Sequence, residues 1–178
     1  MRYLVTGHTG FKGAWLIGML SQMGHEIAGY SLKAEKNSLF ERANLEELMA
    51  FHFEGDIRNR AQLKASIEKA NPEVIVHLAA QPLVLDSYRN PDLTYTTNVN
   101  GTLNLLSVIS ELRFEGIALV ITTDKVYFDS GKGVYSEGDP LGGFDPYSSS
   151  KAMADLMTQS WQKSNPELKV LIARAGNV

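Results

Sequence analysis

Tyr147 and Lys151 are two side chains that could transfer a proton together. A spacing of four residues places both on one face of a helix, and Asp145-Pro146 just before them is typical of a helix start. A nearby ammonium group favours the phenolate, so the tyrosine can accept a proton from an alcohol below its usual pKa of ~10. The pair therefore predicts alcohol oxidation by hydride transfer.

A second set of reactive side chains lies upstream, where Thr122-Thr123-Asp124-Lys125 ends an apolar segment. Strand ends in a parallel sheet point into the ligand crevice. There Thr123 could bond a substrate hydroxyl, while Asp124 and Lys125 add an acid and a base that simple oxidation does not need. The alternative is a turn in which Asp124 caps the backbone and Lys125 is solvated. Because the tyrosine and lysine follow downstream, we interpret the triplet as catalytic.

A glycine-rich turn, Gly7-His-Thr-Gly10-Phe-Lys-Gly13, follows the first apolar segment. Glycines there permit a tight turn and a close approach of the backbone to a pyrophosphate, whose charge the next helix N-terminus meets. The alternative is an ordinary glycine-rich turn, but the strand-turn-helix context favours a dinucleotide. We assign to cofactor binding the residues Gly7, Thr9, Gly10, Phe11, Lys12 and Gly13.

The acidic residue that often binds the ribose after the second strand is absent. Ser31 could bond a ribose hydroxyl and Lys33 could meet a 2′-phosphate, so the choice between NAD and NADP stays open. Asp56-Ile57 could read an adenine edge, or Asp56 could cap the helix that begins near Asn59.

Several further positions lie at strand ends or inside helices. Ala79 and Ala80 would let a cofactor pass close to the backbone, whereas His77 is expected to pack in the sheet. Asn98 could stabilise a backbone kink or bind a water near the site. The alternative is that it lies on the surface of a helix. The remaining cofactor contacts are assigned to Leu78, Ala79, Ala80, Gln81, Asn98, Thr122, Tyr147, Lys151 and Arg174. Substrate contacts are assigned to Gln81, Ser87, Thr123 and Asn177.

The elements that position these residues alternate along the chain. Apolar runs predict strands over 2–6, 26–30, 48–53, 74–78, 117–122 and 169–174. Helical spacing predicts helices over 11–23, 59–70, 92–112 and 147–163, with 131–144 as a loop and 31–44 as a loop with or without a helical turn. This order predicts an α/β fold, a Rossmann-type doubly wound parallel sheet with helices on both faces.

Composition limits the functional class. The 178 residues fit one domain, 1–178, and a net charge of −3 with a pI near 5.8 argues against nucleic acid or an anionic membrane as partner. The sequence has no cysteine, and its four histidines lack metal-ligand spacing, so we expect no metal. The N-terminus runs straight into a strand, and apolar runs stay below the ~20 residues of a membrane span. We expect a cytoplasmic protein.

These motifs together resemble the extended short-chain dehydrogenase/reductases. The segments that carry the resemblance are 6–13, 77–83, 97–99, the Tyr147 and Lys151 pair, and 174–178. Within that family the chain looks most like the CDP-glucose 4,6-dehydratases, because related dTDP-glucose enzymes have Thr-Asp-Glu where this chain has Thr123-Asp124-Lys125. Sugar epimerases usually lack this acid-base pair.

The resemblance implies a mechanism. Tyr147 would take the proton of the sugar 4-hydroxyl while hydride leaves carbon 4 for the nicotinamide, and Lys151 would keep the tyrosine anionic. Lys125 would remove the proton at carbon 5, which requires a neutral lysine, and Asp124 would protonate the departing 6-hydroxyl. Hydride return to carbon 6 gives a 4-keto-6-deoxy sugar. The second interpretation is a nucleotide-sugar epimerase, and the third is a cofactor-binding or subunit-association module without catalysis.

The resemblance also bears on the extent and assembly of the chain. Family members continue for about as many residues again, into the lobe that holds much of the substrate. We therefore expect an N-terminal fragment without the C-terminal substrate lobe, which binds NAD without turnover. The resemblance implies a homodimer through the helices 98–112 and 147–163; alternatively, their apolar stripes only cover the sheet.

Overall fold

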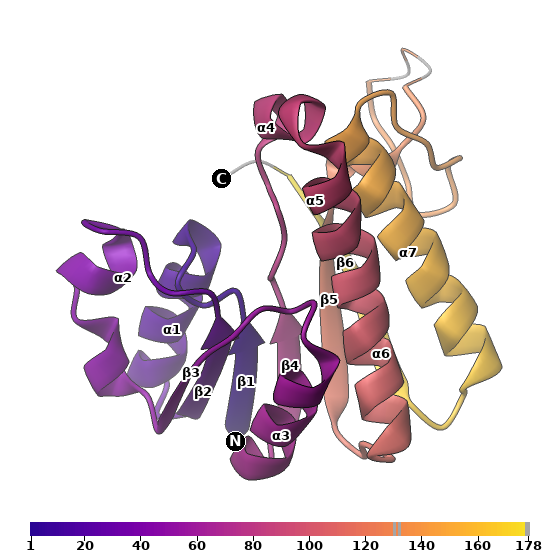
Figure 1. Cartoon of the computed structure of the whole chain (residues 1–178). Helices are drawn as coiled ribbons and strands as arrows, with labels where there is room; N and C mark the ends of the chain where they lie inside the picture. Colours follow the sequence, from indigo (N-terminus) through magenta and orange to yellow (C-terminus); the bar gives the residue numbers. More distant parts are fainter. Residues whose placement is uncertain (130, 132, 177–178) are drawn as a thin grey trace.

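The fold is built on one parallel six-stranded sheet. The computed structural model describes residues 1–129, 131 and 133–176, and the strands lie in the order β3-β2-β1-β4-β5-β6 (Figure 1). The strands are β1 (Arg2–Thr6), β2 (Glu26–Ser31), β3 (Phe51–Glu54), β4 (Val74–His77), β5 (Ile117–Thr123) and β6 (Lys169–Ala175). From β1 the chain adds strands first on one side (β2, β3) and then on the other (β4, β5, β6). Such sheets bind ligands in the crevice at this switch point, at the carboxyl ends of the strands. The predicted doubly wound sheet is confirmed.

Helices cover both faces of this sheet (Figure 1). They are α1 (Phe11–Gln22), α2 (Leu39–Arg42), α3 (Arg60–Ala70), α4 (Val84–Arg89), α5 (Pro91–Tyr95), α6 (Gly101–Glu111) and α7 (Pro146–Ser164). One core joins side chains of α3 and α6 to the strands, with Met157 and Trp161 of α7 packed against it. A second core joins α1 and α2 to the opposite face through side chains such as Ile17 and Phe40. Burial of these two apolar layers is the main stabilising contribution to the fold.

Capping residues set the ends of the helices. Asn59 begins α3 by accepting a hydrogen bond from the Gln62 N–H, and Asn71 ends it in the left-handed conformation. Asp145 caps α7 through the Ser148 N–H, with Pro146 at the first helical position. The Asp145-Pro146 signal in the sequence is therefore confirmed.

Three segments differ from the sequence prediction. The third strand is β3 alone, because Leu48 ends a 3₁₀ turn that begins after Asn44, a residue in the left-handed conformation. Leu48 extends the apolar run in sequence, but its side chain is 44% exposed and the register with β2 begins at Phe51. Within 31–44, a short α2 starts at the Ser38 cap. The helix α4 was missed because its six residues are too few for an apolar period to show.

The long helix predicted over 92–112 is present but changes its winding. α5 continues into a π-helical segment, Thr96–Asn100, and then into α6. π-Helical turns inside helices are often found at functional sites. The predicted helix over 92–112 is thus present, with an irregular segment near its start.

In the part of the chain that the structure describes, every helix is too short or too polar to cross a bilayer.

Candidate active site

The glycine turn is held between three strands. Gly7 has a positive φ of 73° and donates its N–H to the carbonyl of Tyr30 on β2, at 2.9 Å. A Cβ at Gly7 would lie 2.7 Å from the backbone nitrogen of Ala79, just after β4. A Cβ at Gly13 would lie 2.3 Å from the Gly7 carbonyl oxygen. Both positions therefore require glycine, and the turn lies against the ends of β1, β2 and β4.

The N-terminus of α1 is open to an anion. Its first turn contains no acidic side chain, and its cap, Gly10, contributes no side-chain hydrogen bond. The first backbone N–H groups of a helix lack internal partners and carry partial positive charge. Lys12 lies on this first turn, and its ammonium donates to the carbonyl of Gly176 at 3.3 Å. These groups fit a pyrophosphate, as the sequence predicted.

The hydroxyl groups of Thr9 and Ser31 meet beside this turn at 2.8 Å. Thr9 also donates to the carbonyl of Leu32 at 3.1 Å. The glycine turn is therefore tied to the end of β2, where a ribose would lie in a dinucleotide site.

Asp56 does not cap α3, because Asn59 does. The Asp56 carboxylate instead accepts hydrogen bonds from the backbone and guanidinium of Arg58, and the Arg58 hydrogen bond holds the pKa of Asp56 below its ordinary value. Ile57 is buried, in contact with the position of Gly101 on α6. The interpretation of Asp56 as the helix cap is wrong, and the Asp56 carboxylate forms an ion pair with Arg58.

The end of β4 is fixed by buried polar contacts. His77 is 2% exposed and lies between the hydroxyls of Thr6, at 2.7 Å, and Thr102, at 3.1 Å. Burial lowers its pKa to about 3, so the ring is neutral. His77 packs in the sheet as expected.

Asn98, inside the π-helical segment, is also buried. Its side chain bonds the backbone of Gln81 in both directions and donates to the hydroxyl of Ser150 at 2.9 Å. The kink interpretation of Asn98 is confirmed, and the helix-surface alternative is wrong. Ala79 and Ala80 are half-buried between these anchors.

The end of β5 carries the triplet. The Thr123 hydroxyl bonds the Asp124 carboxylate at 3.0 Å and accepts from the Lys125 N–H at 3.3 Å. Thr123 is buried, whereas Asp124 and Lys125 are exposed. The exposure of Lys125 means that the described chain does not desolvate its ammonium.

Tyr147 and Lys151 lie on the first two turns of α7. Burial raises the pKa of Tyr147, and a hydrogen bond with the Thr123 hydroxyl opposes that rise. The Lys151 ammonium donates to the carbonyl of Ile121 at 2.9 Å. Burial lowers the pKa of Lys151 to about 8, with Lys12 acting in the same direction and Asp155 against it. The net effect of the protein on the pKa of Tyr147 is a rise caused by burial, and the role of Lys151 in favouring the phenolate stays a prediction.

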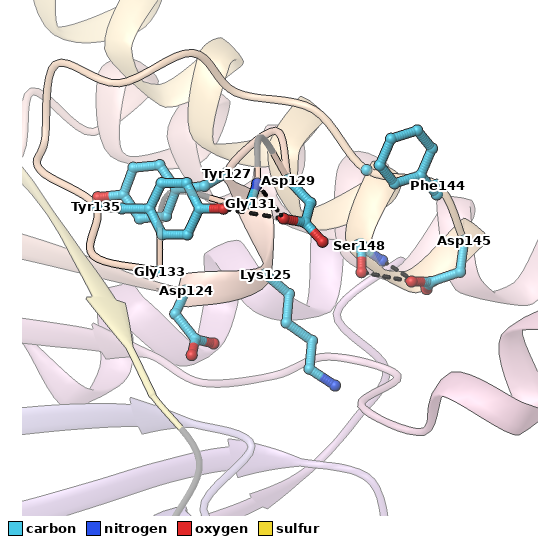
Figure 2. A pocket seen from close by; sticks show the side chains of 11 residues that line it. Asp124, Lys125, Tyr127, Asp129, Gly131, Gly133, Tyr135, Phe144, Asp145 and Ser148 are labelled. Carbon is cyan, nitrogen blue, oxygen red and sulfur yellow. Dashed lines mark hydrogen bonds between the residues drawn. The ribbon is translucent and has the colours of Figure 1, made fainter.

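A cavity of about 420 Å³ opens beside the triplet. Figure 2 shows Asp124 and Lys125 at its edge, with the rings of Tyr127 and Tyr135 stacked face to face. Its lining residues are Asp124, Lys125, Tyr127, Asp129, Gly131, Gly133, Tyr135, Gly143, Phe144, Asp145 and Ser148. The proposed acid and base therefore face a space large enough for a sugar ring.

The other assigned residues have partners within the protein. Ser87 is buried and donates to the carbonyl of Val84, and the Gln81 side chain bonds Thr94 and the backbone of Leu83. The Thr122 hydroxyl and the Arg174 guanidinium both donate to Asp155. Asn177 lies outside the described residues.

Sequence reasoning missed Asp155 and the aromatic wall of the cavity. Asp155 follows Lys151 by one helical turn, and this spacing could have identified it. Tyr127 and Tyr135 lie in or beside a glycine-rich loop, where periodicity gives no signal.

Comparison with known proteins agrees with this architecture. The family model described as GDP-mannose 4,6 dehydratase matches residues 4–177. A CDP-glucose 4,6-dehydratase from Salmonella typhimurium is 44% identical over 188 residues, covering 99% of this chain and 52% of that protein. The chain spans about half the length of the curated relatives it matches.

Two solved structures have the same fold. The dTDP-glucose 4,6-dehydratase from Bacillus anthracis, in complex with NAD, is 30% identical with a TM-score of 0.82, covering 98% of this chain and 54% of that one. The UDP-glucose 4-epimerase from Brucella ovis, also with NAD, is 25% identical with a TM-score of 0.86, covering 99% and 52%. The chain belongs to the GDP-mannose 4,6-dehydratase family, within the NAD-dependent epimerases and dehydratases of the short-chain dehydrogenase/reductases.

Proposed function

We propose that this chain is the cofactor-binding part of a nucleotide-sugar 4,6-dehydratase that converts CDP-glucose to CDP-4-keto-6-deoxyglucose. The observation that carries the proposal is the position of Asp124 and Lys125 in the wall of the cavity, which also includes Asp145 and Ser148 on either side of Tyr147. An acid and a base beside an alcohol-oxidising tyrosine fit elimination of water after oxidation. The CDP-glucose substrate is taken from the similarity to the Salmonella enzyme.

The cofactor proposed is NAD. The uncapped N-terminus of α1 and Lys12 would hold its pyrophosphate, and Thr9 with Ser31 would hold the adenosine ribose. Bound NAD supplies the ability to accept a hydride from carbon 4 and to return it to carbon 6.

The charges near Ser31 favour NAD over NADP. A hollow of about 470 Å³ lies just after β2, and it contains one lysine, Lys33. Four carboxylates line the same hollow: Glu41, Glu46, Glu47 and Glu54. A 2′-phosphate placed there would meet an excess of negative charge. Calorimetry on this chain should give tighter binding of NAD than of NADP; the reverse preference would contradict the assignment.

The protein groups would act on the sugar in sequence. Tyr147, hydrogen-bonded to Thr123, takes the proton of the 4-hydroxyl as carbon 4 becomes a ketone. The ketone acidifies carbon 5, from which Lys125, in its neutral form, removes a proton. Asp124, in its protonated form, donates a proton to the 6-hydroxyl, which leaves as water. Lys125 returns its proton to carbon 5 as carbon 6 is reduced. The product has lost one water in total, and the sugar shows no net change in oxidation level across carbons 4 and 6.

Mass spectrometry of CDP-glucose incubated with NAD and a full-length enzyme that contains this segment tests this reaction. Dehydration lowers the product mass by one water, whereas epimerisation leaves it unchanged. Asp124→Asn and Lys125→Met should abolish water loss while NAD binding remains, and the exposed Lys163→Met is the matched control. Water loss that survives both substitutions would contradict the assigned roles.

A noncatalytic role is the second candidate, favoured by the coverage of about half of each relative. In that case NAD binds, and the sugar nucleotide is unchanged with this chain alone. Binding of NAD without turnover is the result we expect for these residues.

A homodimer and a cytoplasmic location complete the proposal. The helices 98–112 and 147–163 expose Leu103, Met153 and Leu156, each at least 38% accessible. A second copy could cover these side chains in a four-helix arrangement. Light scattering should give a dimer, and Leu156→Glu should give a monomer; a monomeric wild type would remove the dimer from the proposal.

A further inference from the structure

Asp155 is a buried carboxylate that joins three elements. It has no exposed surface, and it accepts hydrogen bonds from Thr122 on β5, Arg174 on β6 and Gln159 on α7. Thr122 and Arg174 are register partners on adjacent strands, so one carboxylate spans the pair. Burial alone would raise the pKa of Asp155, but these hydrogen bonds hold it below its ordinary value. The carboxylate is thus a fixed negative charge at the end of the sheet.

Arg174 uses both ends of its guanidinium. Nε and Nη2 donate to the two oxygens of Asp155, each at 2.9 Å, in the bidentate geometry that fits arginine to a carboxylate. The remaining nitrogen, Nη1, donates to the hydroxyl of Tyr127 and to the carbonyl of Glu137, each at 3.0 Å. The guanidinium also lies 4.9 Å from the centre of the Tyr127 ring. Arg174 therefore links the end of the sheet to two separate stretches of the cavity wall.

These stretches, residues 127–129 and 133–144, are here called the cavity wall segments. Tyr127 and Leu141 form a single antiparallel bridge, and the Tyr127 and Tyr135 rings stack 4.9 Å apart at 8°. Tyr135 donates to the Asp129 carboxylate at 3.2 Å, as Figure 2 shows. Most side chains of the wall segments are exposed, so apolar burial contributes little to their order.

We propose that Arg174, held by Asp155, is a positioning residue that orders the cavity wall segments around the proposed substrate space. It acts through Tyr127 and the Glu137 carbonyl, which connect the two segments to each other and to β6. The proposal rests on the proposed function for the identity of what the cavity holds. The order of the wall itself is independent of that identity.

Two substitutions of Arg174 distinguish its positioning role from simple compensation of the Asp155 charge. Arg174→Lys keeps a positive charge beside Asp155, but an ammonium lacks the planar set of donors that reaches Asp155, Tyr127 and Glu137 together. Arg174→Gln removes the charge as well. We therefore expect the melting temperature to fall in Arg174→Gln and to recover largely in Arg174→Lys, while both variants lose the order of the wall.

Hydrogen exchange on this chain measures that order. Amides of the wall segments should exchange at least ~10-fold faster in both variants, with the protection of β1, β4 and α6 unchanged in Arg174→Lys. In spectra of ring-labelled tyrosine, the Tyr127 and Tyr135 signals should move toward their unfolded positions. Glu137→Ala is the matched control, because Arg174 contacts only the carbonyl of that residue.

Two outcomes would overturn the proposal. Wild-type exchange and wild-type tyrosine signals in Arg174→Lys would mean that only charge compensation matters. Exchange that rises equally throughout the sheet and the wall would mean a merely structural ion pair. Neither readout requires turnover, so a failed dehydratase assay leaves this test intact.

Discussion

The side chain of Asn98 forms a two-way hydrogen-bonded pair with the backbone of Gln81. Its Oδ1 accepts from the Gln81 N–H at 2.8 Å, and its Nδ2 donates to the Gln81 carbonyl at 3.1 Å. The pair connects the π-helical segment to the chain leaving β4, next to the switch point of the sheet. An amide is the side chain that can both donate and accept here.

Replacing Asn98 by alanine should lower the free energy of unfolding by ~2–4 kcal/mol. The substitution leaves the Gln81 N–H and carbonyl without their partner in a buried place, and a buried unpaired group costs ~1–3 kcal/mol. Urea unfolding measures the effect. Asn100→Ala, two residues later and exposed, is the control and should change stability by less than ~1 kcal/mol. Equal effects of the two substitutions would contradict the role given to Asn98.

The position of Asn98 also shows what the sequence could and could not predict. Strand-helix alternation and the glycine turn were enough for the sheet, because apolar periodicity reflects burial directly. The kink at Asn98 was one of three open interpretations, since a lone asparagine in a helix has no periodic signal. Its partners, Gln81 and Ser150, are distant in sequence and meet only in the folded chain.

The cavity wall was beyond prediction for a related reason. Tyr127 stacks on Tyr135 and accepts a hydrogen bond from Arg174, which lies 47 residues from Tyr127 along the chain. The Tyr147 and Lys151 spacing was read correctly, but the pKa of Tyr147 follows from its burial, which depends on the whole fold. Local spacing therefore predicted that Tyr147 and Lys151 share one helix, whereas their pKa values depend on the tertiary structure.

His77 should make the protein sensitive to acid. Its pKa is about 3 in the folded chain and ~6.5 when unfolded, so the unfolded state binds the extra proton between these values. Stability is therefore fully present above pH ~6.5 and is lost as pH falls, by up to ~1.4 kcal/mol per pH unit for this one group. His77→Gln should reduce the measured slope between pH 4 and 6 by about that amount.

The control for His77 is Thr102→Val, which removes one hydrogen-bond partner and keeps the histidine. This variant should be less stable than wild type, with the acid slope retained. A His77→Gln variant with the wild-type slope would show that the ring does not carry the acid dependence.

Gly7 and Gly24 show two different reasons why a position requires glycine: a positive φ, and the lack of space for a Cβ. Both have positive φ, at 73° and 74°, but a Cβ at Gly7 would lie 2.7 Å from the Ala79 nitrogen, whereas a Cβ at Gly24 meets nothing within 4 Å. Gly24→Ala should cost ~1 kcal/mol from backbone strain alone. Gly7→Ala should cost at least ~3 kcal/mol, because backbone must also move. Urea midpoints of the two variants test this, and similar losses would contradict the collision.

Lys151 should give the protein a second pH dependence at alkaline pH, with the same sign as that of His77. Its pKa is about 8 in the folded chain and ~10.5 when unfolded, since burial disfavours the ammonium. Between these values the unfolded chain holds a proton that the folded chain has released. The free energy of unfolding therefore rises with pH across this window, by up to ~1.4 kcal/mol per pH unit. The penalty for burying the charge is present in full below pH ~8.

Replacing Lys151 by methionine isolates this contribution. The variant keeps an unbranched apolar side chain but has no titrating group, so its stability should rise less steeply than wild type between pH 8 and 10. The absolute stability at pH 7 depends also on the lost hydrogen bond to Ile121, so the slope is the decisive measurement. Thr158→Val, a buried substitution on the same helix that keeps the lysine, should retain the wild-type slope. If Lys151→Met and Thr158→Val gave the same slope, the lowered pKa of Lys151 would not be the source of the alkaline pH dependence.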